Sequence, residues 1–282
     1  MAGVVSIQFG GAITVGLIDR LGVVWTLAAR NVSAGIVLLL ITRPPVRRIL
    51  RQRGRLVMGF ATVITVNGLA LYIAIARLPL GVVVAIAFAG PLTLTVVRAH
   101  SPRSPIYALL ACVGVLLIVD PFGATEDFDV IGLSAAALGA LGWAAYLLMS
   151  ARAGDVLGGT DGLAVALALS ATGLLPVALI IGPAGEGAPV LTVAVAAVAV
   201  SSTAFPFAME TLALMRLPIG LVGILASTEP AVAAVTGFLV AGQALSLSSV
   251  SGISLIVLAS VAASADAHSR VAFDDFRQPT IT

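Results

Sequence analysis

Two ionisable residues, Arg30 and Glu229, lie inside long apolar stretches that contain no other charge. A charge in such a stretch is costly unless it is paired or used, so each marks a functional hypothesis. Glu229 is expected either to carry a coupling proton or to hold a cationic amine. Arg30 is expected either to pair with Glu229 or to bind a carboxylate. A fixed ion pair that only locks two helices together is the structural alternative.

Further polar and aromatic side chains interrupt the apolar stretches and extend this set. The polar members need hydrogen-bond partners when buried, so each faces either a ligand or a neighbouring helix. The aromatic members line a site, pack against each other or lie at a membrane interface. Glu210 is expected at a cytoplasmic helix end, as an interfacial or gate charge. The full set is Gln8, Asn67, Tyr72, Phe88, Trp143, Tyr146 and Glu210.

The composition determines the class of protein that must position these residues. Of the 282 residues, 60% are hydrophobic and 10% are charged, and the mean hydropathy is +1.14. A soluble domain has about a quarter of its residues charged. The apolar residues come in long runs, whereas a membrane β-barrel has short alternating segments. We therefore expect an all-α integral membrane protein.

The apolar runs divide into ten expected transmembrane helices, separated by short loops rich in turn-forming residues. Most are close to the roughly 20 residues that a bilayer requires, and the first and fifth are the shortest. Nine helices are the alternative, if the first segment is incomplete. The expected spans are 4–18, 22–42, 56–76, 80–97, 105–120, 130–150, 162–182, 190–209, 218–241 and 246–265.

Arginines predict the orientation of these helices. Six of the thirteen residues 43–55 are arginine, and such loops stay on the cytoplasmic side of a membrane. Twelve arginines then lie in the cytoplasm, whereas Arg20 and Arg77 lie outside. Both chain termini are expected in the cytoplasm, and residues 266–282 are expected to form a disordered tail there.

Several classes of function are not indicated. All fifteen basic residues are arginines placed mainly at helix ends, so the net charge of +2 does not point to nucleic-acid binding. The single Cys112 and the two histidines, His100 and His268, show no metal-ligand spacing. Zinc-protease and nucleotide-binding motifs are absent from the sequence. No metal, cofactor or enzymatic activity is expected.

A seven-residue motif occurs twice, 139 residues apart. Residues 77–83, Arg-Leu-Pro-Leu-Gly-Val-Val, recur as residues 216–222, Arg-Leu-Pro-Ile-Gly-Leu-Val. Five expected helices separate the copies, and because five is odd, the second half must enter the membrane from the opposite side. Such inverted repeats are typical of secondary transporters. We expect two five-helix repeats, residues 1–124 and 125–265.

The same offset relates two prolines, Pro91 and Pro230, that fall inside expected helices. A proline in a helix interior removes one backbone hydrogen bond and frees the carbonyl four residues earlier. At membrane depth that carbonyl needs a partner, which a polar cavity supplies. We expect the prolines to mark helix breaks beside a site between the halves; simple packing kinks are the alternative.

The repeated motif and its surroundings resemble the EamA-type carriers of the drug/metabolite transporter superfamily, and among these the bacterial threonine/homoserine exporters. The resemblance implies an inner-membrane location and transport by alternating access between two inverted repeats. It covers nearly the whole chain. The matching stretches are 6–8, Asn67, Tyr72, 85–91, 143–146, 202–206, Glu210, 216–218 and 229–231.

Two positions depart from the pattern of these carriers. Ala87 stands where the similar exporters have a glutamate before Phe-x-Gly-Pro, and Gln243 follows Gly242 where glutamate is usual. The change at position 87 removes a cavity carboxylate, which leaves the amino-acid substrate open.

The residues and the resemblance together indicate a secondary carrier that exports a small amino acid, threonine-like or homoserine-like, or a related polar metabolite. Export of drug-like amines or sugar derivatives on the same fold is the alternative, and a passive channel is a further one. The expected partners are a small-molecule substrate and the lipid bilayer, with protons as candidate coupling ions. A homodimer is left open.

Overall fold

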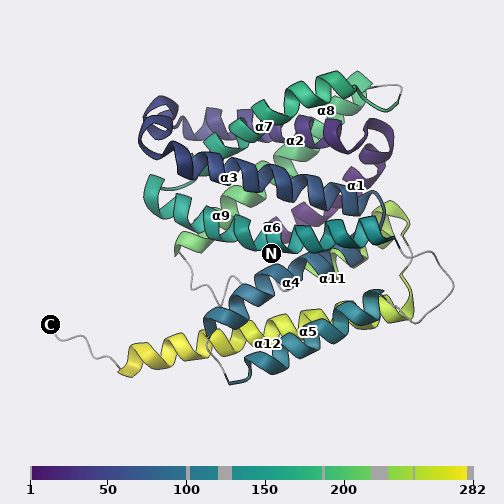
Figure 1. The fold of residues 1–282 in the computed structure, drawn as a ribbon, viewed down its shortest axis with the longest axis vertical. Helices are drawn as coiled ribbons and strands as arrows, with labels where there is room; N and C mark the ends of the chain where they lie inside the picture. Colours follow the sequence, from purple (N-terminus) through teal and green to yellow (C-terminus); the bar gives the residue numbers. More distant parts are fainter. Residues whose placement is uncertain are drawn as a thin grey trace.

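The chain folds into helices that run back and forth between two ends of the molecule (Figure 1). The computed structural model describes residues 2–99, 102–119, 129–185, 188–216, 228–243 and 245–277, and every regular element in these ranges is helical. In chain order the helices are α1 (Ala2–Leu21), α2 (Val23–Thr42), α3 (Val46–Ile75), α4 (Leu80–Ala99), α5 (Ser104–Val119), α6 (Val130–Leu157), α7 (Asp161–Ile181), α8 (Ala188–Ala199), the π-helix η1 (Val200–Ala204), α9 (Phe205–Arg216), α11 (Glu229–Ala241) and α12 (Leu247–Arg277).

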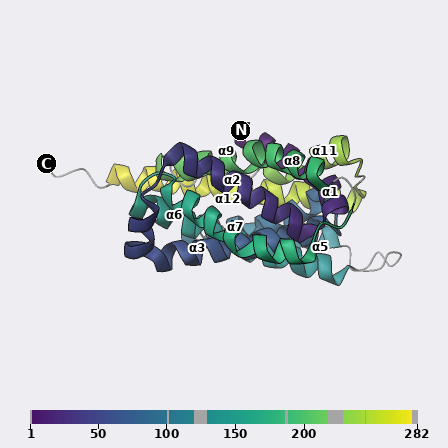
Figure 2. The ribbon, with the colours of Figure 1, turned by 90° about the horizontal axis from the view of Figure 1, so that it is seen from above.

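Most helix axes share one direction in Figures 1 and 2, as the helices of a membrane protein do. In the described residues, seven helical segments are long and apolar enough to cross a bilayer, and three apolar segments are shorter. The chain is therefore a multi-pass helical membrane protein, and the expected all-α class is confirmed. The seven are Gly3–Leu21, Val23–Thr42, Val46–Ile75, Val130–Leu157, Asp161–Ile181, Pro189–Ala213 and Leu247–Asp266; the shorter ones are Leu80–Leu94, Pro105–Ile118 and Glu229–Ala241.

Several helices are longer than the apolar runs predict. The first helix, α1, has 20 residues and is not the short member that we expected. Helix α3 already begins within the basic loop, at Val46. Helix α12 continues to Arg277, so the expectation of disorder was wrong for residues 266–277. In each case the helix extends beyond the boundary of the apolar run, which a hydropathy boundary does not detect.

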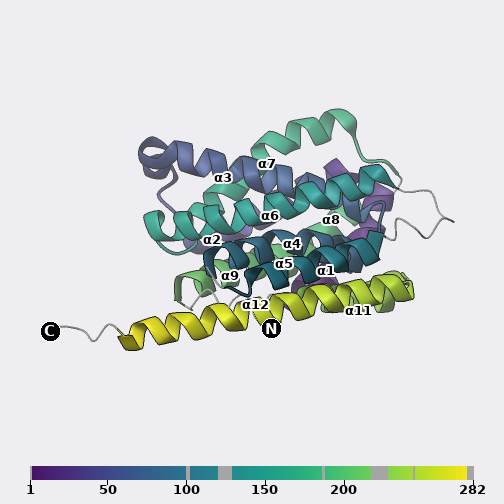
Figure 3. The same ribbon diagram turned by 60° about the horizontal axis from the view of Figure 1, so that its bottom comes forward.

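Helices α5 and α12 lie side by side along one edge of the molecule (Figures 1 and 3). A methyl group on Gly114 would lie 2.8 Å from Cγ1 of Ile256, and one on Gly252 would lie 2.7 Å from Cγ1 of Ile118. Glycine at both positions therefore lets the two backbones approach closely. The contacts are reciprocal and antiparallel, because residues 114 to 118 run against residues 256 to 252.

Helices α2 and α7 form a second extensive contact, and polar side chains join them. Nδ2 of the fully buried Asn31 donates to Oγ of Ser170 at 2.9 Å, and these two residues lie 139 positions apart. The Ser170 hydroxyl also shares a hydrogen bond of 2.7 Å with Thr65 of α3. A buried hydrogen-bond chain thus ties three helices together where water is excluded.

A π-helix, η1, joins α8 to α9 within the eighth expected span. Its wider turn alters the hydrogen-bond register of the chain, and such bulges recur at functional sites. The Ser6 hydroxyl of α1 donates to the carbonyl oxygen of Ser201 at 2.7 Å. Opposite η1, a methyl group on Gly10 would collide with the side chain of Ser202. Helix α1 therefore packs directly on η1.

The start of α4 is held from two sides. The Leu80 amide donates to Oε1 of Gln243 at 2.9 Å, which satisfies one of the free N–H groups at the start of the helix. In the preceding loop, Arg77 Nη1 lies 3.1 Å from Oδ2 of Asp129. Oδ1 of Asp129 accepts from the Gly132 amide at 2.7 Å; this bond, together with Arg77, lowers the pKa of Asp129.

Candidate functional site

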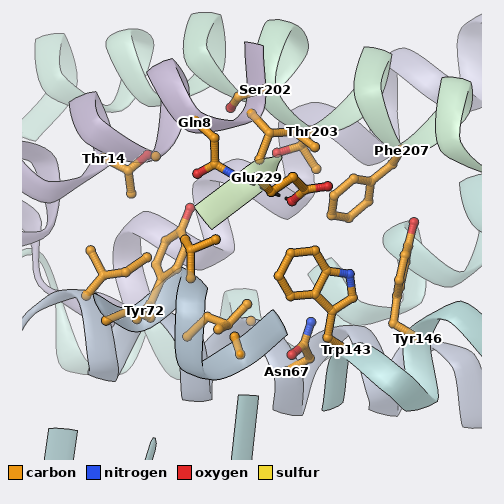
Figure 4. A pocket seen from close by; sticks show the side chains of 18 of the residues that line it. Gln8, Thr14, Asn67, Tyr72, Trp143, Tyr146, Ser202, Thr203, Phe207 and Glu229 are labelled. Carbon is orange, nitrogen blue, oxygen red and sulfur yellow. Dashed lines mark hydrogen bonds between the residues drawn. The ribbon is translucent and has the colours of Figure 1, made fainter. Parts of the chain in front are cut away.

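A cavity of about 130 Å³ lies between the two halves of the chain (Figure 4). Helices α1, α2, α3 and α4 of the first half contribute to its wall, as do α6, η1, α9 and α11 of the second half. Seven of the residues predicted for binding line it: Gln8, Arg30, Asn67, Tyr72, Trp143, Tyr146 and Glu229.

Arg30 is held in the cavity wall by two aromatic rings. Its Nη1 donates to the hydroxyl of Tyr72 at 3.3 Å, and its guanidinium carbon lies 5.4 Å from the Tyr72 ring centroid. On another side, the ring centroid of Phe207 lies 5.6 Å from the same carbon. These cation–π contacts fix the guanidinium without neutralising its charge.

Glu229 is the first residue of α11 and is 5% exposed. Its Oε2 accepts a long hydrogen bond, 3.4 Å, from Nε2 of Gln8 on α1 (Figure 4). Glu229 and Arg30, both within the described residues, form no ion pair with each other. Of the two alternatives for Arg30, the direct pair with Glu229 is therefore not formed, because each charge has its own polar or aromatic neighbours from other helices.

Three polar atoms beside the cavity are buried without a hydrogen-bond partner among the described residues: Nε of Arg30, Oδ1 of Asn67 and the hydroxyl of Tyr146. A buried polar group without a partner costs about 1–3 kcal/mol, so such groups are rare. The side chains that carry these atoms all line the cavity, and the atoms are one donor, one acceptor and one group that does both.

The predicted aromatic residues divide into two roles. Trp143 and Tyr146 reach the cavity, and Figure 4 shows the indole ring between Glu229 and Asn67. Phe88 does not line the cavity; its ring packs edge-on against Trp143 with the centroids 5.8 Å apart. Phe88 therefore supports the Trp143 ring from behind and does not itself contact a ligand in the cavity.

Glu210 lies inside α9 and lines the same cavity as Glu229. The expectation that it closes a helix at the cytoplasmic edge was wrong, since α9 continues to Arg216. The apolar run weakens near Glu210, but the helical hydrogen bonds do not end there. The cavity therefore has two carboxylates, and the sequence pattern assigned only one of them to it.

The two matched prolines differ in position. Pro91 lies inside α4, as predicted, but α4 continues beyond it to Ala99, so Pro91 does not end the helix. Pro230 is the second residue of α11, where its missing N–H costs nothing because the first turn has no acceptor for it. Residues 217–227, which include most of the second motif copy and the first part of the expected helix, lie outside the described residues.

Among the lining residues that were not predicted are three polar ones and one aromatic one: Thr14, Ser202, Thr203 and Phe207. Ser202 and Thr203 lie in η1, and Figure 4 shows them beside Gln8 and Glu229. Their stretch carried the family resemblance, which was the available signal. The π-helix itself leaves no recognisable pattern in apolar sequence, so the direction of these side chains was not predictable.

The two departures from the family pattern have separate consequences. Ala87 of α4 lines the cavity with its methyl group, so the wall is apolar at this point. Gln243 does not line the cavity and instead caps α4 through Leu80. Position 87 therefore belongs to the cavity wall, whereas Gln243 makes a structural hydrogen bond away from it.

Residues 130–265 match the EamA-like transporter family. The threonine/homoserine exporter RhtA of Salmonella typhimurium (strain SL1344) is 31% identical over 265 residues, covering 92% of this chain and 85% of that protein. RhtA of Escherichia coli (strain K12) is 30% identical over 261 residues, covering 91% and 86%.

A protein of known crystal structure has the same fold. It superposes with a TM-score of 0.65 over 95% of this chain and 96% of its own, at 19% sequence identity. At this identity the likeness concerns the helix arrangement alone.

Proposed function

We propose that this chain, which belongs to the EamA-like transporter family, exports a small amino acid of the threonine or homoserine type by alternating access. We place it in a bacterial inner membrane, where exporters of this kind work. The observation that carries the proposal is the cavity between the halves, which brings a guanidinium, a carboxylate and unpartnered polar atoms together.

The two charges suit the two ends of a zwitterion. The guanidinium of Arg30 is a donor for a substrate carboxylate, with its Nε free of protein partners. Glu229 is an acceptor for the substrate ammonium group, since its only neighbour at hydrogen-bond distance among the described residues is Gln8 at 3.4 Å. Asn67 and Tyr146 remain for a side-chain hydroxyl, which distinguishes threonine and homoserine from apolar amino acids of similar size.

The size of the cavity separates this proposal from its main alternative. Its volume of about 130 Å³ is well below the roughly 300–1,000 Å³ of pockets that hold drug-sized ligands. A drug-like amine or a sugar derivative would need the helices to separate before it entered. The volume therefore favours a small metabolite.

A single carboxylate accounts for coupling as well as binding. Glu229 holds either a proton or a substrate ammonium group, because both compete for the same oxygens. Exchange of one for the other on the two sides of the membrane is then proton–substrate antiport. Alternating access limits that exchange to one occupant at a time, which a passive channel does not do.

Two inverted repeats, residues 1–124 and 125–265, provide the two alternating states in this proposal. Support comes from the helices that the repeat makes equivalent: α2 contacts α7, and α5 contacts α12 in an antiparallel, reciprocal way. Reciprocal contacts are what a two-fold axis produces, and antiparallel equivalent helices place that axis in the membrane plane. Asn31 and Ser170, 139 residues apart, then meet on the axis.

The decisive experiment measures counterflow in proteoliposomes. Vesicles loaded with unlabelled threonine are expected to accumulate labelled threonine or homoserine, and an imposed pH gradient is expected to drive further uptake. A panel of alanine, a drug-like cation and a sugar phosphate tests the cargo. Accumulation of a panel compound in place of threonine would overturn the cargo, and unsaturable flux without counterflow would overturn the carrier mechanism.

Glu229→Gln tests the role of the carboxylate, with Glu210→Gln as the matched control in the same cavity. Glu229→Gln is expected to lower gradient-driven transport at least tenfold while the protein is still inserted and monodisperse. Loss of both gradient-driven transport and counterflow in Glu229→Gln supports the ammonium-binding role. Unchanged transport in Glu229→Gln, or an equal loss in Glu210→Gln, contradicts a special role for Glu229.

A further inference from the structure

We propose that residues 43–55 form a binding surface for the phosphate groups of anionic phospholipids, at the end of the molecule where α2 and α3 meet. This surface is separate from the cavity, and the proposal does not depend on the cargo. It rests on the geometry of the segment, on how its apolar side is anchored and on the charges that it presents.

The segment lies across the direction of the membrane helices. Arg43 ends α2 in a left-handed conformation with φ 47°, and two prolines follow it. Helix α3 then starts at Val46 but is interrupted at Arg53, whose φ of −134° and ψ of 25° are not helical. Figures 1 and 2 show the start of α3, dark blue, turned across the axis of the rest of that helix.

Length requires this turn. At about 1.5 Å per residue, the part of α3 after Arg53 spans about 33 Å, which already covers a hydrocarbon core of about 30 Å. Residues 46–52 therefore have no place in the hydrocarbon and belong at the level of the lipid headgroups.

Apolar and basic residues occupy opposite sides of this short helix. Ile49 is buried, and Ile49 and Val46 pack against the core that α6 and α7 share with α3. Leu50, one helical step from Val46, is 38% exposed and available to acyl chains. The spacing of these three residues is that of an amphipathic helix lying in an interface.

The basic side faces outward and has no protein counter-charge. All six arginines of the surface are exposed, and none forms an ion pair with a described residue. The sequence has no acidic residue between Asp19 and Asp120. The helical end of α12 lies at the opposite edge of the molecule in Figure 1.

Phosphate is the group that these arginines fit. A guanidinium binds phosphate oxygens through two parallel hydrogen bonds. An anionic leaflet attracts basic segments at its surface by about a factor of five in affinity per arginine. A turn that lays the helix flat brings Arg47, Arg48 and Arg51 to the same headgroup level, which a loop extending into water would not do.

The test uses the full chain purified in a neutral detergent, titrated with phosphatidylglycerol or phosphatidylcholine and followed by thermal unfolding. Phosphatidylglycerol is expected to raise the unfolding midpoint saturably, and the rise is expected to shrink as salt screens the charges. In the triple variant Arg47→Gln/Arg48→Gln/Arg51→Gln, the half-saturating lipid concentration is expected to increase roughly 100-fold. The control variant Arg20→Gln/Arg152→Gln, with exposed arginines elsewhere, is expected to respond as the parent does.

Several outcomes overturn the proposal. Equal stabilisation by phosphatidylcholine would show that the headgroup charge is not recognised. An unchanged triple variant would place the lipid elsewhere, and full competition by glycerol phosphate would identify a site for free phosphate. If the triple variant does not fold, the lysine variant Arg47→Lys/Arg48→Lys/Arg51→Lys decides, because it keeps the charge and is expected to keep at least a tenth of the affinity.

Discussion

The helices α4 and α11 contain prolines that lie 139 residues apart, the offset of the repeated motif, yet the two helices meet their neighbours in opposite ways. In α4 the residue before the proline is Gly90, and a methyl group there would overlap the carbonyl oxygen of Ala140 on α6. In α11 the equivalent residue is Glu229, which lines the cavity and contacts Gln8 of α1. Gly90 thus allows the α4 backbone to pack against the α6 backbone, whereas Glu229 places a charge at the cavity.

The second cavity charge follows the same rule. Arg30 lies in the first half, and the residue 139 positions later, in α7, is Leu169. The first half thus contributes the guanidinium of Arg30 and the second half contributes carboxylates, and Arg30 and Glu229 each have an apolar or small residue at the position 139 residues away. Positions that the 139-residue offset relates therefore carry different residues at the cavity, and under the proposed function a zwitterion would have one preferred orientation.

The largest effect is expected from the charge that only the first half carries. Arg30→Met should lower threonine counterflow about 100-fold, because a substrate carboxylate would lose a buried charged partner worth roughly 2–5 kcal/mol. Leu169→Met, the same replacement at the equivalent position, should leave transport within about twofold of the parent. Similar losses in both variants would mean that the cavity is not polarised as described.

A large effect on stability is expected at the tight packing of α4. Gly90→Ala should lower the free energy of unfolding by about 1–3 kcal/mol or more, since the α6 backbone cannot withdraw as a flexible side chain can. Gly173→Ala in α7, with no atom within 4 Å of the added methyl group, should be neutral or slightly stabilising. Thermal unfolding in detergent measures both, and an unaffected Gly90→Ala protein would contradict the close approach.

A smaller effect is expected where α4 is capped. Gln243→Ala removes the acceptor of the Leu80 amide and should cost about 1 kcal/mol. Gln243→Glu keeps an acceptor at the positive end of the helix and should be as stable as the parent or slightly more stable. Because Gln243 lies away from the cavity, the ratio of threonine to homoserine transport should not change in either variant.

The smallest effect is expected in the loop before α4. The pKa of Asp129 is lowered below its ordinary value of 3.8, chiefly by the Gly132 amide and then by Arg77. A carboxylate of this kind stabilises the folded state above that ordinary value, and the contribution disappears as the pH falls through the lowered folded-state pKa. Asp129→Asn should therefore unfold at a slightly lower temperature than the parent at pH 7, and at the same temperature near pH 2.

Much of the site could be predicted because its residues are conspicuous in apolar sequence. Gln8, Asn67 and Tyr72 were selected as polar groups in apolar segments and also match the family resemblance, and all three line the cavity. For Phe88 the sequence left ligand contact and aromatic packing both open, because a phenylalanine inside a membrane helix looks the same in either role, and the structure has it packed against Trp143. Glu210 was misassigned because its location depended on where an apolar run was judged to end.

The sequence by itself determined the membrane class, the transporter family and the identity of the two isolated charges. Composition, apolar runs and motifs can all be recognised along the chain without knowing which helices pack together. Tertiary structure alone decided that Arg30 and Glu229 do not pair, that η1 directs Ser202 and Thr203 to the cavity, and that Gln243 caps α4. These outcomes depend on how helices far apart in the chain rotate and approach one another. The type of a residue in α4 or α11 does not specify which helix it will contact.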